Sequence, residues 1–235
     1  IKYHLGGTFR GTYYTLNDNI INGRIRGVAG VVGCNNARSR HNETHIRVLK
    51  ELIKNDVLVL TTGCDGITAA IHGLLTPESA AYHCGPGLAE ICEVVGIPPI
   101  LHLGSCVDNS RILLAATEVV KAGGLGTDLC DLPVAGSAPE WMSEKAISIG
   151  QYFVTSGVYT VFGGTLPTSG APVFHDYISK ELEGVYGGKW DVEPDPIKHA
   201  WLMIDHIDKK RKALGIDKAR ERVLMDMADR QALEG

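Results

Sequence analysis

The sequence lacks most of the features that would assign a chain to a functional class at once. Its 235 residues contain no apolar run of the roughly 18 residues that a membrane-spanning helix needs. No signal peptide, low-complexity tract or internal repeat longer than one strand–helix unit is visible. The formal net charge is −4, and nothing indicates a nucleic-acid surface. We therefore expect no membrane span and no nucleic-acid partner, and the length suits one large domain or a tight pair.

Cysteine is too sparse for a disulfide scaffold, with six residues in the chain, so we expect a reducing, cytoplasmic setting. Three of the six, Cys34, Cys64 and Cys106, each close an apolar run bounded by glycine. The runs are 28–33, 57–63 and 100–105. Each run predicts a buried strand of a parallel sheet. Because the carboxyl ends of parallel strands share one edge, we expect the three thiols to face one crevice there.

Strand and helix patterns alternate from about residue 25 to residue 165, which predicts an α/β fold with a parallel sheet wrapped by helices. Strands are predicted at 25–33, 57–62, 99–103, 131–135 and 158–162. Helices are predicted at 43–54, 66–75, 86–95, 109–122 and 139–156, and charge-rich helices follow at 176–182, 196–214 and 217–233. The chain opens on Ile1 rather than Met, and we expect a fragment or processed product of a longer protein.

Three soft thiolates at one edge favour iron–sulfur or another soft-metal chemistry. Lys145 lies early in the helix after the fourth predicted strand, at the same rim, where its ammonium group could donate a hydrogen bond and offset negative charge. The alternative for Lys145 is a solvated side chain paired with Glu144 or Trp141. Ile149 lies one helical turn later on the same face and should border whatever Lys145 faces.

Other polar and thiol side chains are interpreted as structural. Asp65, directly after Cys64, is interpreted as a cap for the following helix, and the alternative is that its carboxylate tunes the potential of a bound cluster. No histidine forms a convincing ligand pair at the rim, and His45 is expected near a helix start or at the surface. Cys84, Cys92 and Cys130 are expected to be buried or free thiols without a ligand role.

Four motifs together resemble the anaerobic nickel–iron carbon monoxide dehydrogenases. They are residues 31–36, 61–64, 102–111 and 139–146, and the similarity continues through 163–167 and 192–196. The resemblance implies that residues 1–235 form the C-terminal Rossmann-like domain of such an enzyme. It further implies a doubly wound parallel sheet with helices on both faces, with an α/β core at 1–170 and a mainly helical tail at 171–235.

The resemblance also implies an activity and a site. The activity is the reversible oxidation of carbon monoxide with water to carbon dioxide, two protons and two electrons at a nickel–iron–sulfur cluster of the Ni-4Fe-4S type. By motif, Cys34, Cys64 and Cys106 are ligands of the cluster, Lys145 is the active-site lysine, and Ile149 shapes the pocket for carbon monoxide. In the family the remaining cysteine and histidine ligands and additional 4Fe-4S clusters lie upstream, so we expect the fragment alone to be inactive.

The same resemblance implies an anaerobic homodimer that passes electrons to a ferredoxin-like acceptor, and leaves open whether the enzyme joins an acetyl-CoA synthase. Two alternatives stay open from the residues. One is a hybrid-cluster protein, a hydroxylamine reductase, against which the segment 107–111 argues. The other is a non-catalytic Rossmann-like binding module, although no Gly-x-Gly-x-x-Gly follows the first predicted strand and no acidic ribose ligand is evident.

Overall fold

The computed structural model of the chain describes residues 13–164 and 166–218. In this part of the chain, parallel strands form one six-stranded sheet in the order β3-β2-β1-β4-β5-β6. The strands are β1 (Gly27–Val31), β2 (Val57–Thr61), β3 (Ile100–His102), β4 (Val134–Ala138), β5 (Thr160–Phe162) and β6 (Trp190–Val192). The strand order reverses direction between β1 and β4, so the predicted α/β fold with a doubly wound parallel sheet is confirmed.

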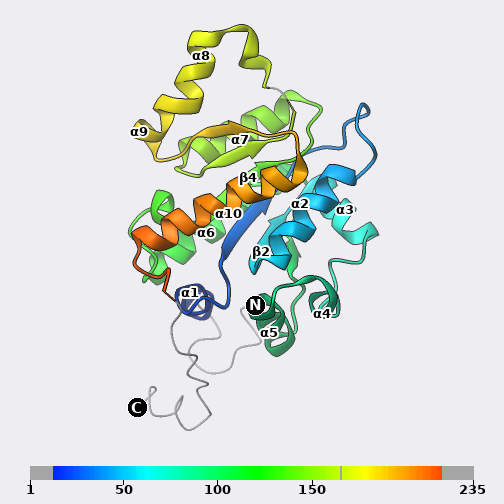
Figure 1. The fold of residues 1–235 in the computed structure, drawn as a ribbon, viewed down its shortest axis with the longest axis vertical. Coiled ribbons are helices and arrows are strands. Elements are labelled where there is room, and N and C mark those ends of the chain that lie inside the picture. Colours follow the sequence, from blue (N-terminus) through cyan, green and yellow to red (C-terminus); the bar gives the residue numbers. More distant parts are fainter. Residues whose placement is uncertain (1–12, 165, 219–235) are drawn as a thin grey trace.

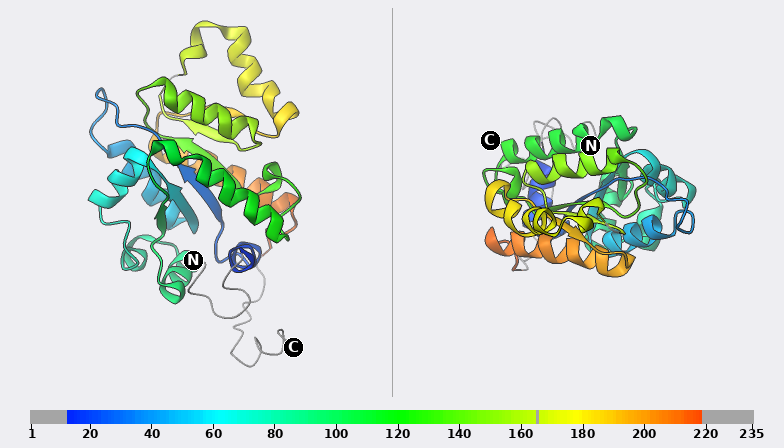
Figure 2. Two further views of the ribbon diagram at one scale, coloured as in Figure 1. Left: turned by 180° about the vertical axis from the view of Figure 1, so that it is seen from behind. Right: turned by 90° about the horizontal axis from the view of Figure 1, so that it is seen from above.

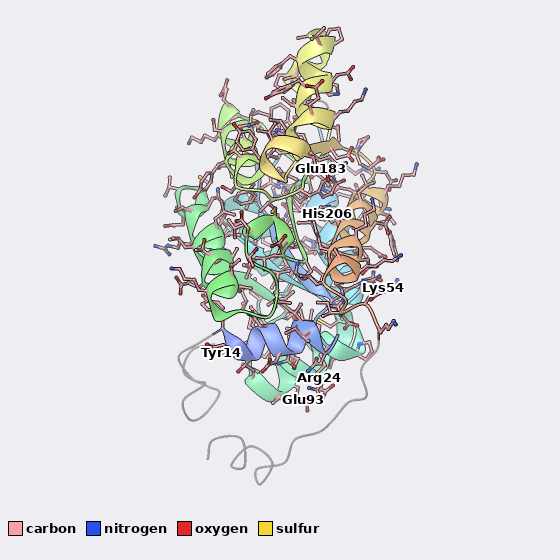
Figure 3. The ribbon with its side chains drawn as sticks, turned by 90° about the vertical axis from the view of Figure 1, so that its left-hand side faces the viewer. Tyr14, Arg24, Lys54, Glu93, Glu183 and His206 are labelled. Carbon is pink, nitrogen blue, oxygen red and sulfur yellow. The ribbon has the colours of Figure 1, made fainter. Side chains whose placement is uncertain are left out.

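Helices cover both faces of the sheet. One face carries α2 (Glu43–Lys54) and α10 (Pro196–Ala213), and the other carries α6 (Ser110–Ala122) and α7 (Glu144–Thr155), as Figures 1 and 2 show from opposite sides. In Figure 3 the molecule is turned so that α10 lies on one side and α6 and α7 lie on the other. The labelled Tyr14 lies in the lower half of this view, and the labelled Glu183 lies above it, toward the segment that contains α8 and α9. None of the helices in the described residues is long and apolar enough to cross a membrane.

Shorter elements complete the described part of the chain. The helices are α1 (Tyr14–Ile21), α3 (Gly63–Ile71), α4 (Ser79–His83), α5 (Pro86–Val95), α8 (Pro172–Asp176) and α9 (Leu182–Tyr186). The single turns are η2 (Cys106–Asp108), η3 (Leu129–Asp131), η4 (Pro167–Gly170) and the π-helical η5 (Tyr177–Glu181). The segment from α8 to α9 extends beyond α7 at the top of Figure 1.

Two paired glycines let α6 and α7 approach the middle of the sheet. Gly30 in β1 lies opposite Gly136 in β4 in the strand register. A Cβ atom at Gly30 would lie 3.3 Å from Ile112 Cγ2, and one at Gly136 would lie 2.9 Å from Phe153 Cδ2. The Phe153 ring occupies this space and is buried, at 1% exposure. Close packing at the centre of the sheet therefore depends on the absence of two side chains.

Two predicted boundaries differ because side chains form turns where the pattern predicted regular structure. The strand predicted at 131–135 begins at Val134, since the Asp131 carboxylate accepts the backbone N–H groups of Thr127 and Asp128 at 2.9 and 3.2 Å. The helix predicted at 139–156 begins at Glu144, since the preceding residues form a loop around the buried Glu140 side chain.

Other elements differ in extent or were not predicted. Helix α3 begins at Gly63 rather than at residue 66, which places Cys64 in the first turn of a helix. The three-residue strand β6 was not predicted, because it is too short to show an alternating pattern. The predicted helix 196–214 corresponds to α10, whereas nearly all of the predicted helix 217–233 lies outside the described residues.

A neutral histidine fastens α10 to β4. The Ser137 hydroxyl lies 2.6 Å from His199 Nε2, and His199 Nδ1 lies 3.0 Å from the Glu193 carbonyl oxygen. Since that carbonyl can only accept, Nδ1 carries the proton, and Nε2 accepts from Ser137. Burial opposes the charged form and lowers the pKa of His199 to about 4.

We expect Gly136→Ala to lower the free energy of unfolding by about 1 to 3 kcal/mol, because the new methyl group would overlap the buried Phe153 ring. Urea denaturation followed by circular dichroism measures the change. Gly184→Ala in α9 is the matched control. A Cβ atom there meets nothing within 4 Å, and alanine favours a helix by up to about 1 kcal/mol. Equal free energies of unfolding for wild type and Gly136→Ala would show that packing of the Phe153 ring does not depend on the absence of a side chain at residue 136.

We expect the stability of the chain to fall as the pH decreases from about 6.5, the pKa of an unfolded histidine, toward about 4, the pKa of folded His199. In this window the unfolded chain binds more protons, which draws the equilibrium toward unfolding by up to about 3 kcal/mol. Denaturation at pH 7 and at pH 4.5 gives the free energy of unfolding at each pH. The decrease in this free energy between the two pH values should be smaller in His199→Gln than in wild type. Other acidic groups and His206 titrate in both proteins, so an equal loss in the two would contradict the assignment.

Candidate metal centre

The three predicted ligand cysteines follow the ends of three adjacent strands at the carboxyl edge of the sheet. Cys34 follows β1, Cys64 lies in the first turn of α3 after β2, and Cys106 opens η2 after β3. The segments after β2 and β3 are in direct contact, since the Gly63 N–H donates to the Gly104 carbonyl at 3.0 Å. A Cβ atom at Gly63 would lie 3.3 Å from Cys106 Cβ. That all three sulfurs face one crevice stays a prediction.

Asn109 ties the Cys106 turn to the loop after β2. The Thr62 hydroxyl donates to Asn109 Oδ1, and Asn109 Nδ2 donates to the Cys106 carbonyl oxygen at 2.7 Å. Asn109 is buried, so its hydrogen bond with Thr62 is shielded from water, and the one to the Cys106 carbonyl oxygen is partly shielded. The loop after the neighbouring strand β2 therefore holds the backbone at Cys106 in place, although the side chain of Cys106 is exposed.

A charged turn supports the same segment from the solvent side. The Asp108 carboxylate accepts the Ser105 N–H at 2.8 Å and pairs with the Arg111 guanidinium at 3.0 Å. These contacts, the backbone hydrogen bond first, hold the pKa of Asp108 below its usual range. Arg111 also donates to the Leu103 carbonyl oxygen at 3.0 Å. The polar residues after Cys106 thus act together as a capping turn.

The loop after β4 holds the Cys34 loop across the point where the strand order reverses. The Cys34 N–H donates to the Glu140 carbonyl oxygen at 3.0 Å. The Glu140 carboxylate accepts the backbone N–H groups of Asn36 at 3.1 Å and Thr44 at 3.3 Å, and its side chain is buried. Gly33 has φ +126°, and a Cβ atom there would lie 2.3 Å from the Glu140 carbonyl oxygen, so only glycine fits.

A buried ion pair links the Cys34 loop to the start of α3. His45 Nε2 donates to the Cys34 carbonyl oxygen at 2.9 Å, and His45 Nδ1 lies 2.7 Å from Asp65 Oδ1. The latter two atoms are not aligned as a hydrogen bond, so the contact is an ion pair. The second Asp65 oxygen accepts the Thr61 hydroxyl at 2.5 Å. Burial opposes the charge of His45, but the Asp65 carboxylate, the Cys34 carbonyl and nearby Glu140 outweigh it and raise the pKa of His45.

Both members of this pair correct a prediction from the sequence. His45 was expected near a helix start or at the surface. It does lie in the first turn of α2, but its side chain is 0% exposed, so the surface position was wrong. Asp65 was interpreted as a helix cap, but it makes no side-chain cap hydrogen bond and its carboxylate is buried. A signal was present in the sequence, since His45, Leu49 and Leu52 share the i, i+4, i+7 spacing of the buried stripe of α2.

Lys145 and Ile149 lie on the same face of α7, which begins at the carboxyl edge. Lys145 is exposed in the first turn, and no ion pair joins it to Glu144 within the described residues. A cation in the first turn opposes the helix dipole, so helix stability does not explain its place. Ile149 and Leu103 both pack against the buried cluster that contains Val32. Val32 precedes Cys34 in the chain, and Leu103 precedes Cys106.

The donor set fits a soft-metal cluster better than a single metal ion. Cys34, Cys64 and Cys106 are free thiols, and two of them are exposed although cysteine is commonly buried. Among the described residues, no three histidine, cysteine or acidic side chains are close enough to hold one metal ion. A cluster is wider than one ion, and thiolates from separate loops can reach it together. As soft donors, the three free thiols are compatible with a metal–sulfur cluster.

Comparison with known proteins identifies the family of the chain. The sequence profile described as the Prismane/CO dehydrogenase family matches residues 4–197. Carbon monoxide dehydrogenase 1 of Methanosarcina mazei is 54% identical over 202 residues, which cover 86% of this chain and 32% of that protein. Carbon monoxide dehydrogenase 1 of Carboxydothermus hydrogenoformans is 40% identical over 209 residues, with coverages of 86% and 32%. The chain thus spans about a third of the length of these relatives.

The solved structures that the chain resembles are also carbon monoxide dehydrogenases. A nickel-free carbon monoxide dehydrogenase from Thermococcus sp. AM4 superimposes with a TM-score of 0.84 at 51% identity, covering 87% of this chain and 32% of that one. An acetyl-CoA synthase/carbon monoxide dehydrogenase with NiZn[Fe4S4] and NiNi[Fe4S4] clusters in its alpha subunits superimposes with a TM-score of 0.80 at 36% identity, covering 86% and 31%.

We expect Glu140→Ala to loosen the Cys34 loop, because the N–H groups of Asn36 and Thr44 lose their buried acceptor. The free energy of unfolding should fall by about 1 to 3 kcal/mol, and these two amides should exchange hydrogen faster. Glu118→Ala is the control, since it removes only an exposed ion pair with Lys121 and should change stability by less than about 0.5 kcal/mol. Wild-type exchange rates at both amides in Glu140→Ala would contradict the role of the carboxylate.

Proposed function

The chain belongs to the Prismane/CO dehydrogenase family, and we propose that it is one domain of an enzyme that oxidises carbon monoxide with water to carbon dioxide, two protons and two electrons, reversibly. The observation that carries the proposal is the placement of three free cysteines within four residues of the carboxyl ends of three adjacent parallel strands. Named relatives at 54% and 40% identity favour this activity over the hybrid-cluster protein and over a binding module without catalysis.

In this proposal Cys34, Cys64 and Cys106 bind part of a nickel–iron–sulfur cluster of the Ni-4Fe-4S type. When bound, the cluster supplies the sites for carbon monoxide and water and accepts the two electrons. Cys64 lies in the first turn of α3, where the positive end of the helix dipole stabilises a thiolate. The other ligands and additional 4Fe-4S clusters would come from the rest of a protein about three times as long.

Lys145 and Ile149 act on the substrate side of the proposed site. The Lys145 ammonium group donates a hydrogen bond to the substrate oxygen atoms, which gain negative charge as carbon monoxide is converted to carbon dioxide. Its exposed position at the start of α7 leaves this group available. Ile149 packs against the buried cluster to which α6 and α7 both contribute, and it provides an apolar wall that limits the water in the pocket.

The proposed setting is an anaerobic, cytoplasmic homodimer that passes electrons to a ferredoxin-like acceptor, which suits a chain with six free thiols. An acetyl-CoA synthase is a further proposed partner. Two observations support it, namely 38% identity to a carbon monoxide dehydrogenase/acetyl-CoA synthase subunit beta from Moorella thermoacetica and the similarity to the solved acetyl-CoA synthase/carbon monoxide dehydrogenase.

We expect Lys145→Ala and Cys64→Ala to fail in different ways when made in the full-length protein that contains this chain. Loss of a positioned donor costs about 10²- to 10³-fold in rate, so Lys145→Ala should keep its nickel and iron but lose carbon monoxide oxidation to that extent. Cys64→Ala should lose metal together with activity, because a ligand is removed. Metal analysis and carbon monoxide-dependent reduction of a viologen dye measure both effects.

Cys130→Ala is the control for the loss of a thiol, since Cys130 lies in η3, before the start of β4 and away from the carboxyl ends of β1, β2 and β3. It should keep both the metal content and the activity of the wild type. Near-normal turnover in Lys145→Ala would contradict the proposed role of Lys145 and would show that it is a solvated helix residue. Full metal content in Cys64→Ala would remove Cys64 from the ligand set.

A further inference from the structure

Backbone pairing alone does not fix the distance between Cys34 and Cys64. The parallel pairing of β1 with β2 ends at Val31 and Thr61. Each of the two cysteines lies three residues beyond its strand, Cys34 in a loop and Cys64 in the first turn of α3. A cluster held by both residues needs their sulfurs at a defined separation, so contacts other than the strand ladder must set it.

One continuous chain of buried and part-buried contacts joins the two segments. It runs from the Cys34 carbonyl oxygen to His45, from His45 to Asp65, and from Asp65 to the Thr61 hydroxyl, with distances of 2.9, 2.7 and 2.5 Å. Asp65 directly follows Cys64, so the His45–Asp65 contact spans from one ligand loop to the other. Helix α2 supplies His45 and is itself packed on the sheet by its apolar stripe.

Stability alone is a weak reason for such a pair. Both side chains are 0% exposed, and removal of two charges from water offsets most of their attraction. Apolar residues of similar volume often stabilise a protein as much as a buried ion pair, or more. A buried pair with defined geometry instead favours one arrangement of the segments that carry it. On its buried side the Cys106 turn, by comparison, is held by the neutral Asn109, and its ion pair between Asp108 and Arg111 lies on the solvent side.

We propose that His45 and Asp65 are positioning residues that set the separation of Cys34 and Cys64 and so control the retention and geometry of the nickel–iron–sulfur cluster. The proposal rests on the proposed function, because it takes both cysteines as ligands. A second, neutral bridge keeps the same elements together without the pair. Asn42 Oδ1 accepts from Asn35 Nδ2 at 2.7 Å and from the Thr68 hydroxyl at 2.9 Å, so loss of the ion pair should alter the spacing rather than the fold.

The test uses the full-length protein with Asp65→Asn, His45→Gln and the double variant. The first readout is the loss of iron and nickel to a chelator, and the second is the electron paramagnetic resonance spectrum of the reduced cluster. Substitution of groups behind metal ligands typically weakens metal binding by about 10- to 100-fold, so we expect faster metal loss on that scale and a changed spectrum. The double variant leaves no unpaired buried charge, and it serves as the test if either single variant fails to fold.

Asp208→Asn is the matched control. It makes the same chemical change in another ion pair, since Asp208 contacts Arg26 at 2.6 Å, just before β1 at the opposite edge of the sheet. This variant should keep the spectrum and the metal retention of the wild type. Thermal unfolding of all variants separates general destabilisation from a specific effect on the cluster.

Two results would overturn the proposal while leaving the proposed function intact. One is a folded double variant with the wild-type spectrum and rate of metal loss, and the other is an equal change in Asp208→Asn. A wild-type protein that binds no nickel–iron–sulfur cluster would instead overturn the proposed function, and the positioning role with it. Faster metal loss with a changed spectrum, confined to the His45 and Asp65 variants, would support the proposal.

Discussion

The central place of β1 in the sheet is the constraint on which the carboxyl edge depends. Its backbone pairs with β2 on one side and β4 on the other, so the strand order reverses beside it. The loop after β1 therefore meets the loops from both halves of the sheet, and Cys34 receives contacts from Glu140 on one side and His45 on the other. A ligand segment in this position is anchored by both halves of the fold.

Polar side chains, rather than apolar packing, hold the three thiol-bearing segments. Glu140, His45, Asp65 and Asn109 are all buried, and each contacts the backbone of a cysteine loop or a side chain that does. Loops leave backbone N–H and C=O groups without regular partners, and at a buried edge these groups require side-chain partners. The network thus satisfies the loop backbone, while the thiols of Cys64 and Cys106 stay exposed at the rim.

Much of this arrangement could be predicted where the signal is local. The amphipathic stripe of α2 and the glycine-bounded apolar runs of β1 and β2 are visible within about ten residues, and the structure places these elements at or close to their predicted bounds. The start of α7 was predicted too early, because only tertiary contacts show that the Glu140 side chain binds the Cys34 loop instead of continuing a helix. Strand β6 depends on β5 as its partner and has no signal of its own.

The sequence by itself determined the alternation of strands and helices and the position of each cysteine directly after a strand, because hydrophobic periodicity and glycine boundaries act between near neighbours. Only the tertiary structure decided that β1 lies between β2 and β4, and that His45 meets Asp65 and the Asn36 N–H meets Glu140. The last contact joins residues 104 positions apart. Such contacts form only when the sheet is assembled, and no local pattern of residues specifies them.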